Sequence, residues 1–422
     1  MAIVAFKGKR ASKHVDAPAQ TLSPEERRTR GRALRETVPR ASHGSWKAPK
    51  DRRDPIELLH ESNRHRLQQL VPIRFGRMLQ PPFTFYRGAA AIMAADLAST
   101  PATGIRVQAC GDAHLSNFGG FATPERRVVF DINDFDETLP APWEWDVKRL
   151  AASVVIAGRD LRFSEKDSSR AATATVRSYR EHMNDYAGMR ALEVWYDAID
   201  IERFIEEATA SEEKREFIKK NLEKAQRKSV PESLFPKLVE HHGAAPRIMD
   251  DPPLIFHPTT AQAPGLKTGY QEAIALYRES LPEHVLVLFD RFHFCDLAAK
   301  VVGIGSVGTL CAVGLFMAGE EDPLFLQVKE ASASVLEPYA GKSLHKNHGE
   351  RVIAGQRLMQ SASDMFLGWT RGSDGRDRYF RQLRDIKFSA IVEAFDVNDL
   401  RDYGRMCGWR LLGRMHDRAT AR

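Results

Sequence analysis

"VVGIGSVGTLCAVGLFMAGEEDPLFLQVKE" (residues 301–330) is the stretch that decides the fold class. Gly303, Gly305 and Gly308 give it a G-x-G-x-x-G spacing, which also fits the turn of a dinucleotide-binding fold. In that fold the glycines open a helix. Here they are followed by β-branched and aromatic residues, the turn "EEDP", and a second run that ends at Lys329. This order predicts strand, turn and strand, and disfavours a Rossmann unit.

The same stretch is free of charge over residues 301–319, a length near that of a membrane helix. Its glycines and β-branched residues disfavour a helix, so we expect strands of a soluble protein and no membrane association. The four cysteines are scattered without a C-x-x-C pair. This usage suits a reducing compartment and predicts a cytoplasmic location.

A glycine hairpin followed by a lysine on the next strand suits phosphate binding. Glycines let backbone N–H groups approach phosphate oxygens without an intervening Cβ, and the lysine adds a fixed positive charge. We therefore expect a nucleotide site that includes Gly303, Gly305, Ser306, Gly308 and Lys329. The alternative, a structural hairpin with a surface lysine, remains open from this stretch alone.

Two polar clusters lie far upstream, in "CGDAHLSNFGG" (110–120) and "FDINDFDET" (130–138). Strand-like patterns at 104–110 and 126–132 place the two clusters at the ends of one expected hairpin. Magnesium takes oxygen ligands, few of them from protein and the rest from phosphate and water. An amide from the first cluster and a carboxylate from the second fit that requirement.

The loop "GDAHLSNFG" resembles the G-D-x-H-x-x-N loop of aminoglycoside and choline phosphotransferases, members of the protein-kinase-like superfamily. The resemblance implies that Asp112 is the catalytic base and that Asn117 and Asp134 bind the metal. Asp136 stands where a glycine is usual, which leaves Asp131 and Asp136 as rival metal ligands.

Further roles follow from the same resemblance. Asp146, in "WEWDVKRLA", would brace the catalytic loop, and a glutamate on a helix after the lysine strand would pair with Lys329. Glu350 has the better helical context, whereas Glu337 is nearer in sequence but precedes a proline. His114 is either a supporting residue of the site or a hydrogen-bonded structural histidine.

Over about residues 30–415 the chain also resembles an uncharacterised bacterial family, domain of unknown function 2252. The resemblance lies in "VPIRFGRMLQPPFTFYRG", "NDFDETLPAPWEWDVKRLA", "VVGIGSVGT", "LQVKEA" and "YFRQLRD". The function of that family is largely unassigned, so this resemblance implies relatedness and leaves the substrate open.

In ordinary kinases the glycine loop precedes the catalytic loop, but here it follows far downstream. We therefore expect an α+β, bilobal, protein-kinase-like fold that is circularly permuted, with the helical large lobe first and an antiparallel-sheet small lobe second. The expected divisions are a basic, largely irregular tail, a helical lobe with the catalytic and metal-binding loops, a strand-rich nucleotide-binding lobe and a C-terminal amphipathic helix (1–50, 51–295, 296–390 and 391–422).

The net charge of +6 belongs to the first 50 residues, which hold twelve Lys and Arg against four Asp and Glu. Such tails are mostly solvated, so nucleic acid is a disfavoured partner. We expect an ATP- and Mg²⁺-dependent phosphotransferase with an unidentified acceptor. Arg74, Arg77 and Arg87 either hold an anionic acceptor or are solvated or structural arginines.

Four other functions remain open from the sequence. A kinase-like fold can transfer AMP, or bind nucleotide only as a regulator. A metal-dependent hydrolase would use Asp112, His114 and the later acids, but it leaves the glycine hairpin and Lys329 unexplained. A nucleic-acid binder would rest on the basic tail. The oligomeric state is also open.

Overall fold

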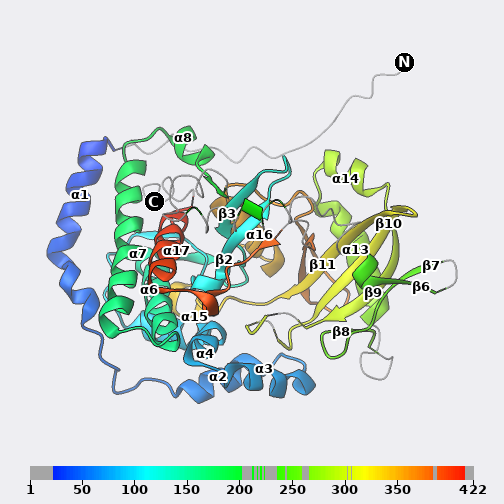
Figure 1. Cartoon of the computed structure of the whole chain (residues 1–422), viewed down its shortest axis with the longest axis horizontal. Helices are drawn as coiled ribbons and strands as arrows, with labels where there is room; N and C mark the ends of the chain where they lie inside the picture. The colour runs from blue at the N-terminus through cyan, green and yellow to red at the C-terminus, as the bar shows by residue number, and fades with distance from the viewer. Residues whose placement is uncertain are drawn as a thin grey trace.

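The computed structural model describes residues 22–413, apart from 243–244, 259–265, 302, 306, 384–386 and most of 202–234. The protein is of the α+β class, with helices and several antiparallel sheets (Figure 1). Long helices gather at one side of the view and the largest sheet lies at the other, with smaller sheets between them. Among the described residues, no helix combines the length and apolar character needed to cross a membrane.

The long helices pack as a group around one hydrophobic core. α6 (Trp143–Asp160) and α7 (Glu165–Tyr186) lie against each other, and α17 (Val397–Arg410) packs on both. Leu400 and Cys407 are buried along α17 and Leu411 just after it, as an amphipathic helix requires. The shorter helices α2, α3, α4 and α5 precede this group (Pro55–Asn63, Val71–Met78, Pro82–Gly88 and Ala90–Ala98).

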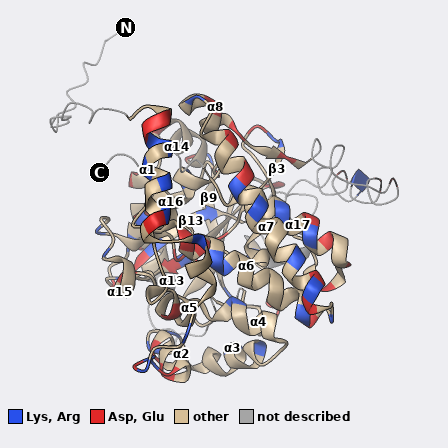
Figure 2. Ribbon diagram, turned by 90° about the vertical axis from the view of Figure 1, so that its left-hand side faces the viewer, with Lys and Arg blue, Asp and Glu red and all other residues tan. Residues whose placement is uncertain are grey.

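The expectation of a largely irregular N-terminal tail is wrong for its described part. α1 (Pro24–Thr37) is a regular helix, followed by the 3₁₀ turn Arg40–Gly44. The cause is local: Ser23 and Glu26 form a capping box, and Pro24 opens the first turn. Basic and acidic residues are mixed along α1 and α7 (Figure 2).

The largest sheet has six antiparallel strands in the order β12-β13-β11-β10-β9-β8. Its strands are Gly368–Arg371, Asp377–Gln382, Asp322–Ala331, Cys311–Gly319, His293–Lys300 and Ile255–Phe256, in that order. The predicted strand–turn–strand is confirmed, with Cys311 opposite Lys329. The glycine loop joins β9 to β10, and no helix follows it, which excludes the Rossmann arrangement at this point.

Both faces of β10 are covered, which explains its long run without charge. Ala312 and Phe316 belong to a core shared with α13 (Leu266–Tyr277) and α14 (Glu283–Phe289). Val313, Leu315 and Met317 belong to another core, which includes residues of β6 and β7 (Val239–His242 and Ala245–Ile248).

The division expected between residues 295 and 296 falls inside β9 and is therefore misplaced. α13 and α14, which precede it, pack on the sheet: the Tyr277 ring stacks on Phe380 with centroids 4.2 Å apart. These helices belong with the sheet because their apolar faces cover it.

Between the long helices and the large sheet lie smaller strands that carry the acidic loops. β1 (Arg106–Ala109) pairs with β4 (Leu139–Pro142), and β2 (Phe118–Ala122) pairs with β3 (Val128–Ile132). β5 and β14 complete the second of these sheets (Ile199–Asp200 and Lys387–Phe388). α15 and α16 follow β11 in the chain (Glu337–Ala340 and His348–Met359).

Candidate functional site

A cavity of about 860 Å³ is lined by segments that lie far apart in the sequence. This volume is within the usual range of ligand sites, roughly 300–1,000 Å³. The cavity brings together half of the site residues singled out from sequence, from the acidic loops, the glycine loop and β11: Asp112, His114, Asn117, Asp134, Gly303, Gly305 and Lys329.

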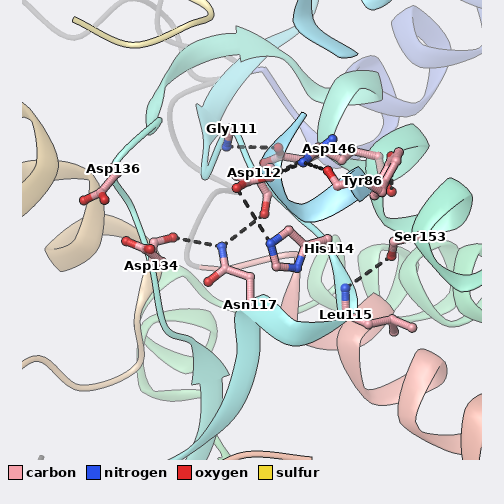
Figure 3. A network of polar contacts seen from close by, with 12 residues as sticks. Tyr86, Gly111, Asp112, His114, Leu115, Asn117, Asp134, Asp136, Asp146 and Ser153 are labelled. Atoms are coloured by element: carbon pink, nitrogen blue, oxygen red, sulfur yellow. Dashed lines mark hydrogen bonds and ion pairs between the residues drawn. The ribbon is translucent and has the colours of Figure 1, made fainter. Parts of the chain in front are cut away.

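One face of α6 holds the loop that carries Asp112. The carboxylate of Asp146 accepts hydrogen bonds from the backbone N–H groups of Cys110 (2.7 Å) and Gly111 (3.0 Å), as the resemblance implies (Figure 3). One helical turn and two turns further on, Arg149 and Ser153 also reach this loop. Burial raises the pKa of Asp146 to about 6.

Gly111 is required where it stands. Its φ of +82° lies in the left-handed region, and a Cβ there would collide with the backbone oxygen of Glu137. The two acidic loops are therefore packed backbone to backbone at this point.

Asp112 is fixed by an arginine that the sequence reasoning did not single out. Arg149 Nε donates to Asp112 Oδ1 at 2.6 Å, and the guanidinium lies over the Tyr86 ring, 4.5 Å from its centroid. The other carboxylate oxygen lies 3.7 Å from His114 Nε2. The i, i+3, i+7 spacing of Asp146, Arg149 and Ser153 was the sequence signal that could have found this face of the helix.

His114 is buried and neutral near pH 7, because burial lowers its pKa to about 4. Its Nδ1 atom is buried and has no hydrogen-bond partner among the described residues. It is therefore not a fully hydrogen-bonded structural histidine.

Asn117 joins the two acidic loops. Its Nδ2 group donates to the backbone oxygens of Asp112 and Asp134, each at 3.1 Å (Figure 3). An amide has one oxygen besides these donors, so Oδ1 is left as an acceptor. The side chain of Asp134 is 42% exposed. One amide oxygen and one accessible carboxylate fit a magnesium ion that takes its remaining ligands from phosphate and water. The described residues contain no cluster of three or more His, Cys, Asp or Glu suited to a metal.

Lys329 faces the acidic loop at 133–137. Its Nζ lies 3.3 Å from Asp134 Oδ1 and 2.6 Å from Asp136 Oδ2, and the Tyr379 hydroxyl donates to Asp136 Oδ1 at 2.5 Å. Burial opposes the charged form of Lys329, but the two carboxylates outweigh it and raise its pKa well above the usual range. The lysine is therefore a permanent cation.

The expectation that Glu350 or Glu337 pairs with Lys329 is wrong. Glu350 lies 3.4 Å from His345 Nδ1, and Glu337 lies 3.9 Å from His348 Nδ1. Neither glutamate forms an ion pair with Lys329, whose acidic partners among the described residues are Asp134 and Asp136.

The cause lies in the face that α16 turns toward the site. Instead of a carboxylate it presents Arg351, which donates to the backbone oxygens of Thr138 (2.6 Å) and Asp136 (2.8 Å). α16 thus holds the loop that carries the acidic partner, and the loop in turn holds the lysine.

Of the three rival acids, Asp131 is not accessible to a metal. It is fully buried, accepts a hydrogen bond from Arg410 Nε at 2.6 Å, and accepts two more from Ser361, each at 2.8 Å. This ion pair ties β3 to α17. Asp136 is occupied by Lys329 and Tyr379, so Asp134 is the acid with the most accessible carboxylate.

Two arginines from the N-terminal part of the described chain donate hydrogen bonds to the backbone of the glycine loop. Gly303 and Gly308 have φ angles of +62° and +87°, which glycine adopts readily. Arg77 donates to the Gly303 oxygen at 2.5 Å, and Arg66 donates to the Val307 oxygen at 2.6 Å. Ser306 lies outside the described residues.

Arg381 on β13 is a second cation that the sequence reasoning missed. It lines the cavity and donates to Gln327 Oε1 at 2.8 Å and to the Asn133 oxygen at 3.1 Å. Burial alone would raise the pKa of Asp134, but Lys329 and Arg381 outweigh burial and lower that pKa. Asp134 is therefore ionised, as a metal ligand must be.

A family model described as "Uncharacterized protein conserved in bacteria (DUF2252)" matches residues 66–422. The match begins after α2 and takes in both acidic loops, the glycine loop and Lys329. No curated protein and no solved structure matches the chain. The extent of the family match shows that the chain belongs to the bacterial family of domain of unknown function 2252.

Proposed function

We propose that this protein is an ATP- and Mg²⁺-dependent phosphotransferase with a circularly permuted, bilobal, kinase-like fold, and that its acceptor carries a hydroxyl group. One observation carries the proposal. Lys329 Nζ lies 3.3 Å from Asp134 although 195 residues separate them, in a cavity shared with Asp112 and the glycine loop. Phosphoryl transfer relies on positioning and charge neutralisation, so these parts are useful only together.

The order of the parts along the chain supports the permutation. The acidic loops come first, on the small strands that precede α6, and the glycine loop and Lys329 come later, on the six-stranded antiparallel sheet. A kinase-like reaction needs the two sets to face one cavity, whichever comes first in the sequence.

In the proposed reaction, Asp112 accepts the proton of the acceptor hydroxyl. The acceptor oxygen bonds to the γ-phosphorus of ATP, the bond from that phosphorus to the β–γ bridging oxygen breaks, and ADP leaves. The hydrogen bond from Arg149 fixes the orientation of Asp112. The glycine-loop N–H groups and Lys329 hold the nucleotide phosphates. Bound to Asn117 and Asp134, Mg²⁺ would neutralise phosphate charge.

The test is to incubate the full chain with ATP, Mg²⁺ and a cell extract and to identify the product by mass spectrometry. A phosphate group added to a hydroxyl supports the proposal, provided that Asp112→Asn abolishes it. Transfer of AMP would contradict the proposed phosphoryl transfer but would remain compatible with the proposed kinase-like fold. Nucleotide binding without transfer would indicate a regulator, and hydrolysis without ATP would indicate a hydrolase.

A further inference from the structure

The three arginines near the catalytic loop differ in what their side chains contact. Arg74 donates to the backbone oxygen of Gly88 at 2.9 Å, and Arg77 donates to that of Gly303. In the part of the chain that the structure describes, the guanidinium of Arg87 has no hydrogen bond or ion pair, and its Nε atom is buried. The first two arginines are thus structural, and the third is not explained by the fold.

Arg87 also differs from other arginines that have a buried, unpaired nitrogen. Each of those donates a second nitrogen to an acceptor, namely Arg74, Arg149, Arg351 and Arg378. Arg87 is partly buried, and only its Nε is a buried atom without a partner among the described residues. Partial burial of an unpaired cation is still costly, and native proteins retain few such groups without a reason. Burial lowers the pKa of Arg87, which is the sign of that cost.

The position of Arg87 indicates what it would bind. It stands in the last turn of α4 and lines the same cavity as Asp112. Glu393 and Asp112 favour its charged form from a distance, but Asp112 is already bound by Arg149. The unpaired Nδ1 of His114 is in the same region of the cavity. Arg87 and His114, each with an unpaired nitrogen among the described residues, therefore line the cavity together with the proposed base.

Two other cations that line the cavity, Lys329 and Arg381, are already engaged. Lys329 contacts both Asp134 and Asp136, and Arg381 donates to Gln327 and to a backbone oxygen. Both cations thus have partners within the protein, whereas Arg87 has no hydrogen-bond or ion-pair partner among the described residues.

We infer that Arg87 binds an anionic group of the acceptor, a phosphate or a carboxylate, next to the hydroxyl that Asp112 deprotonates. The guanidinium offers parallel N–H donors that match two oxygens of such a group. The acceptor class is therefore a hydroxy compound with a negatively charged substituent. This inference rests on the proposed function for the role of Asp112, but the anion site itself can be tested separately.

The test is calorimetry with inorganic phosphate as the probe, titrated into the full chain with and without Mg²⁺ and a non-hydrolysable ATP analogue. The analogue occupies the nucleotide site, so phosphate that still binds reports the acceptor side. We expect Arg87→Ala to weaken this binding at least about tenfold, because hydrogen bonds to charged groups are worth about 1.5–3 kcal/mol. Arg87→Lys keeps the charge but loses the paired donors, so its phosphate affinity should lie between those of the wild type and Arg87→Ala.

Arg126→Ala is the matched control, because Arg126 lines the same cavity but is exposed. It should bind phosphate as the wild type does. The inference is overturned if Arg87→Ala or Arg87→Lys binds phosphate as tightly as the wild type does and its circular dichroism is unchanged. A loss of affinity for the ATP analogue alone also overturns it, because it would assign Arg87 to the nucleotide.

The two hypotheses fail in different ways. If the chain binds phosphate through Arg87 but binds no nucleotide, the anion site stands and the phosphotransferase does not. If it binds the analogue with Mg²⁺ but the phosphate titration gives no heat in the wild type, the anion site falls and the proposed function survives.

Discussion

Asp131 and Asp134 lie three residues apart, yet they occupy opposite kinds of site. Asp131 is fully buried and bound to Arg410 and Ser361, whereas the Asp134 side chain is 42% exposed in the cavity and shares Lys329 with Asp136. The first acid holds β3 against α17, and the second faces the space where a ligand would lie. Burial thus divides this acid-rich segment between one structural acid and one that is open to a ligand.

The same division separates Asp112 from Asp131. Each accepts a hydrogen bond from an arginine Nε at 2.6 Å, but Asp112 opens into the cavity and Asp131 does not. A substitution at the first should therefore change the chemistry, and one at the second should change stability.

Asp112→Asn should give the largest effect. General-base contributions are typically about 10²–10⁴-fold, so turnover should fall by that factor while ATP affinity stays within a few-fold of wild type. Steady-state kinetics of product formation and calorimetry with ATP measure the two quantities. A loss of ATP affinity as large as the loss of turnover would contradict the role of Asp112 as base.

Asp131→Asn should act on stability instead. Removing one partner of a buried ion pair leaves the other charge uncompensated, which typically costs about 3–5 kcal/mol. Here it leaves Arg410 with the Met359 oxygen, which its Nη2 contacts at 2.7 Å. Chemical denaturation should show the loss, and the fraction that remains folded should bind ATP normally. Weaker ATP binding by folded protein would mean that Asp131 belongs to the metal site after all.

His114 should make stability depend on pH. Its pKa is lowered from 6.5 to about 4 by burial, so the unfolded chain takes up the proton first. Its contribution to stability is therefore complete above pH 6.5 and is lost as the pH falls toward 4. The shift corresponds to at most about 3 kcal/mol.

His114→Gln is the variant that isolates this effect. Its stability relative to wild type should improve by up to that amount between pH 7 and pH 4, measured by urea denaturation at each pH. A difference that stays constant over this range would show that the imidazole is not buried in its neutral form. Asp146 titrates in the opposite direction, because its pKa is raised to about 6, but it contributes equally to both proteins.

The sequence was informative where local rules decide the structure. Glycines and β-branched residues sufficed to predict the strands around 301–330, where Cys311 lies opposite Lys329. The helix at 24–37 could also have been found, since "SPEE" is a start signal for a helix.

The sequence was uninformative where contacts between residues far apart in the chain decide the structure. β3 is buried along its whole length, so the alternation of its residues does not distinguish Asp131 from its neighbours. Which side of α16 would face Lys329 depended on how that helix docks, and it docks with Arg351 toward the acidic loop. The unpaired state of Arg87 likewise results from the partners that surround it in space.

The smallest effect is expected at Glu350, and it tests which acid positions Lys329. In an ordinary kinase-like site a helix glutamate holds the lysine, but here Asp136 lies 2.6 Å from Nζ while Glu350 contacts His345. Glu350→Gln should therefore leave stability within about 0.5 kcal/mol, as surface substitutions usually do, and should leave ATP affinity unchanged. Asp136→Asn removes the charge that fixes the lysine, and should weaken ATP about tenfold, the loss of one charged hydrogen bond. Calorimetry with ATP and Mg²⁺ on both variants gives the comparison. The reverse order of effects would mean that Lys329 leaves Asp136 for Glu350 when nucleotide binds, and that the glutamate expected from the kinase resemblance is the functional partner.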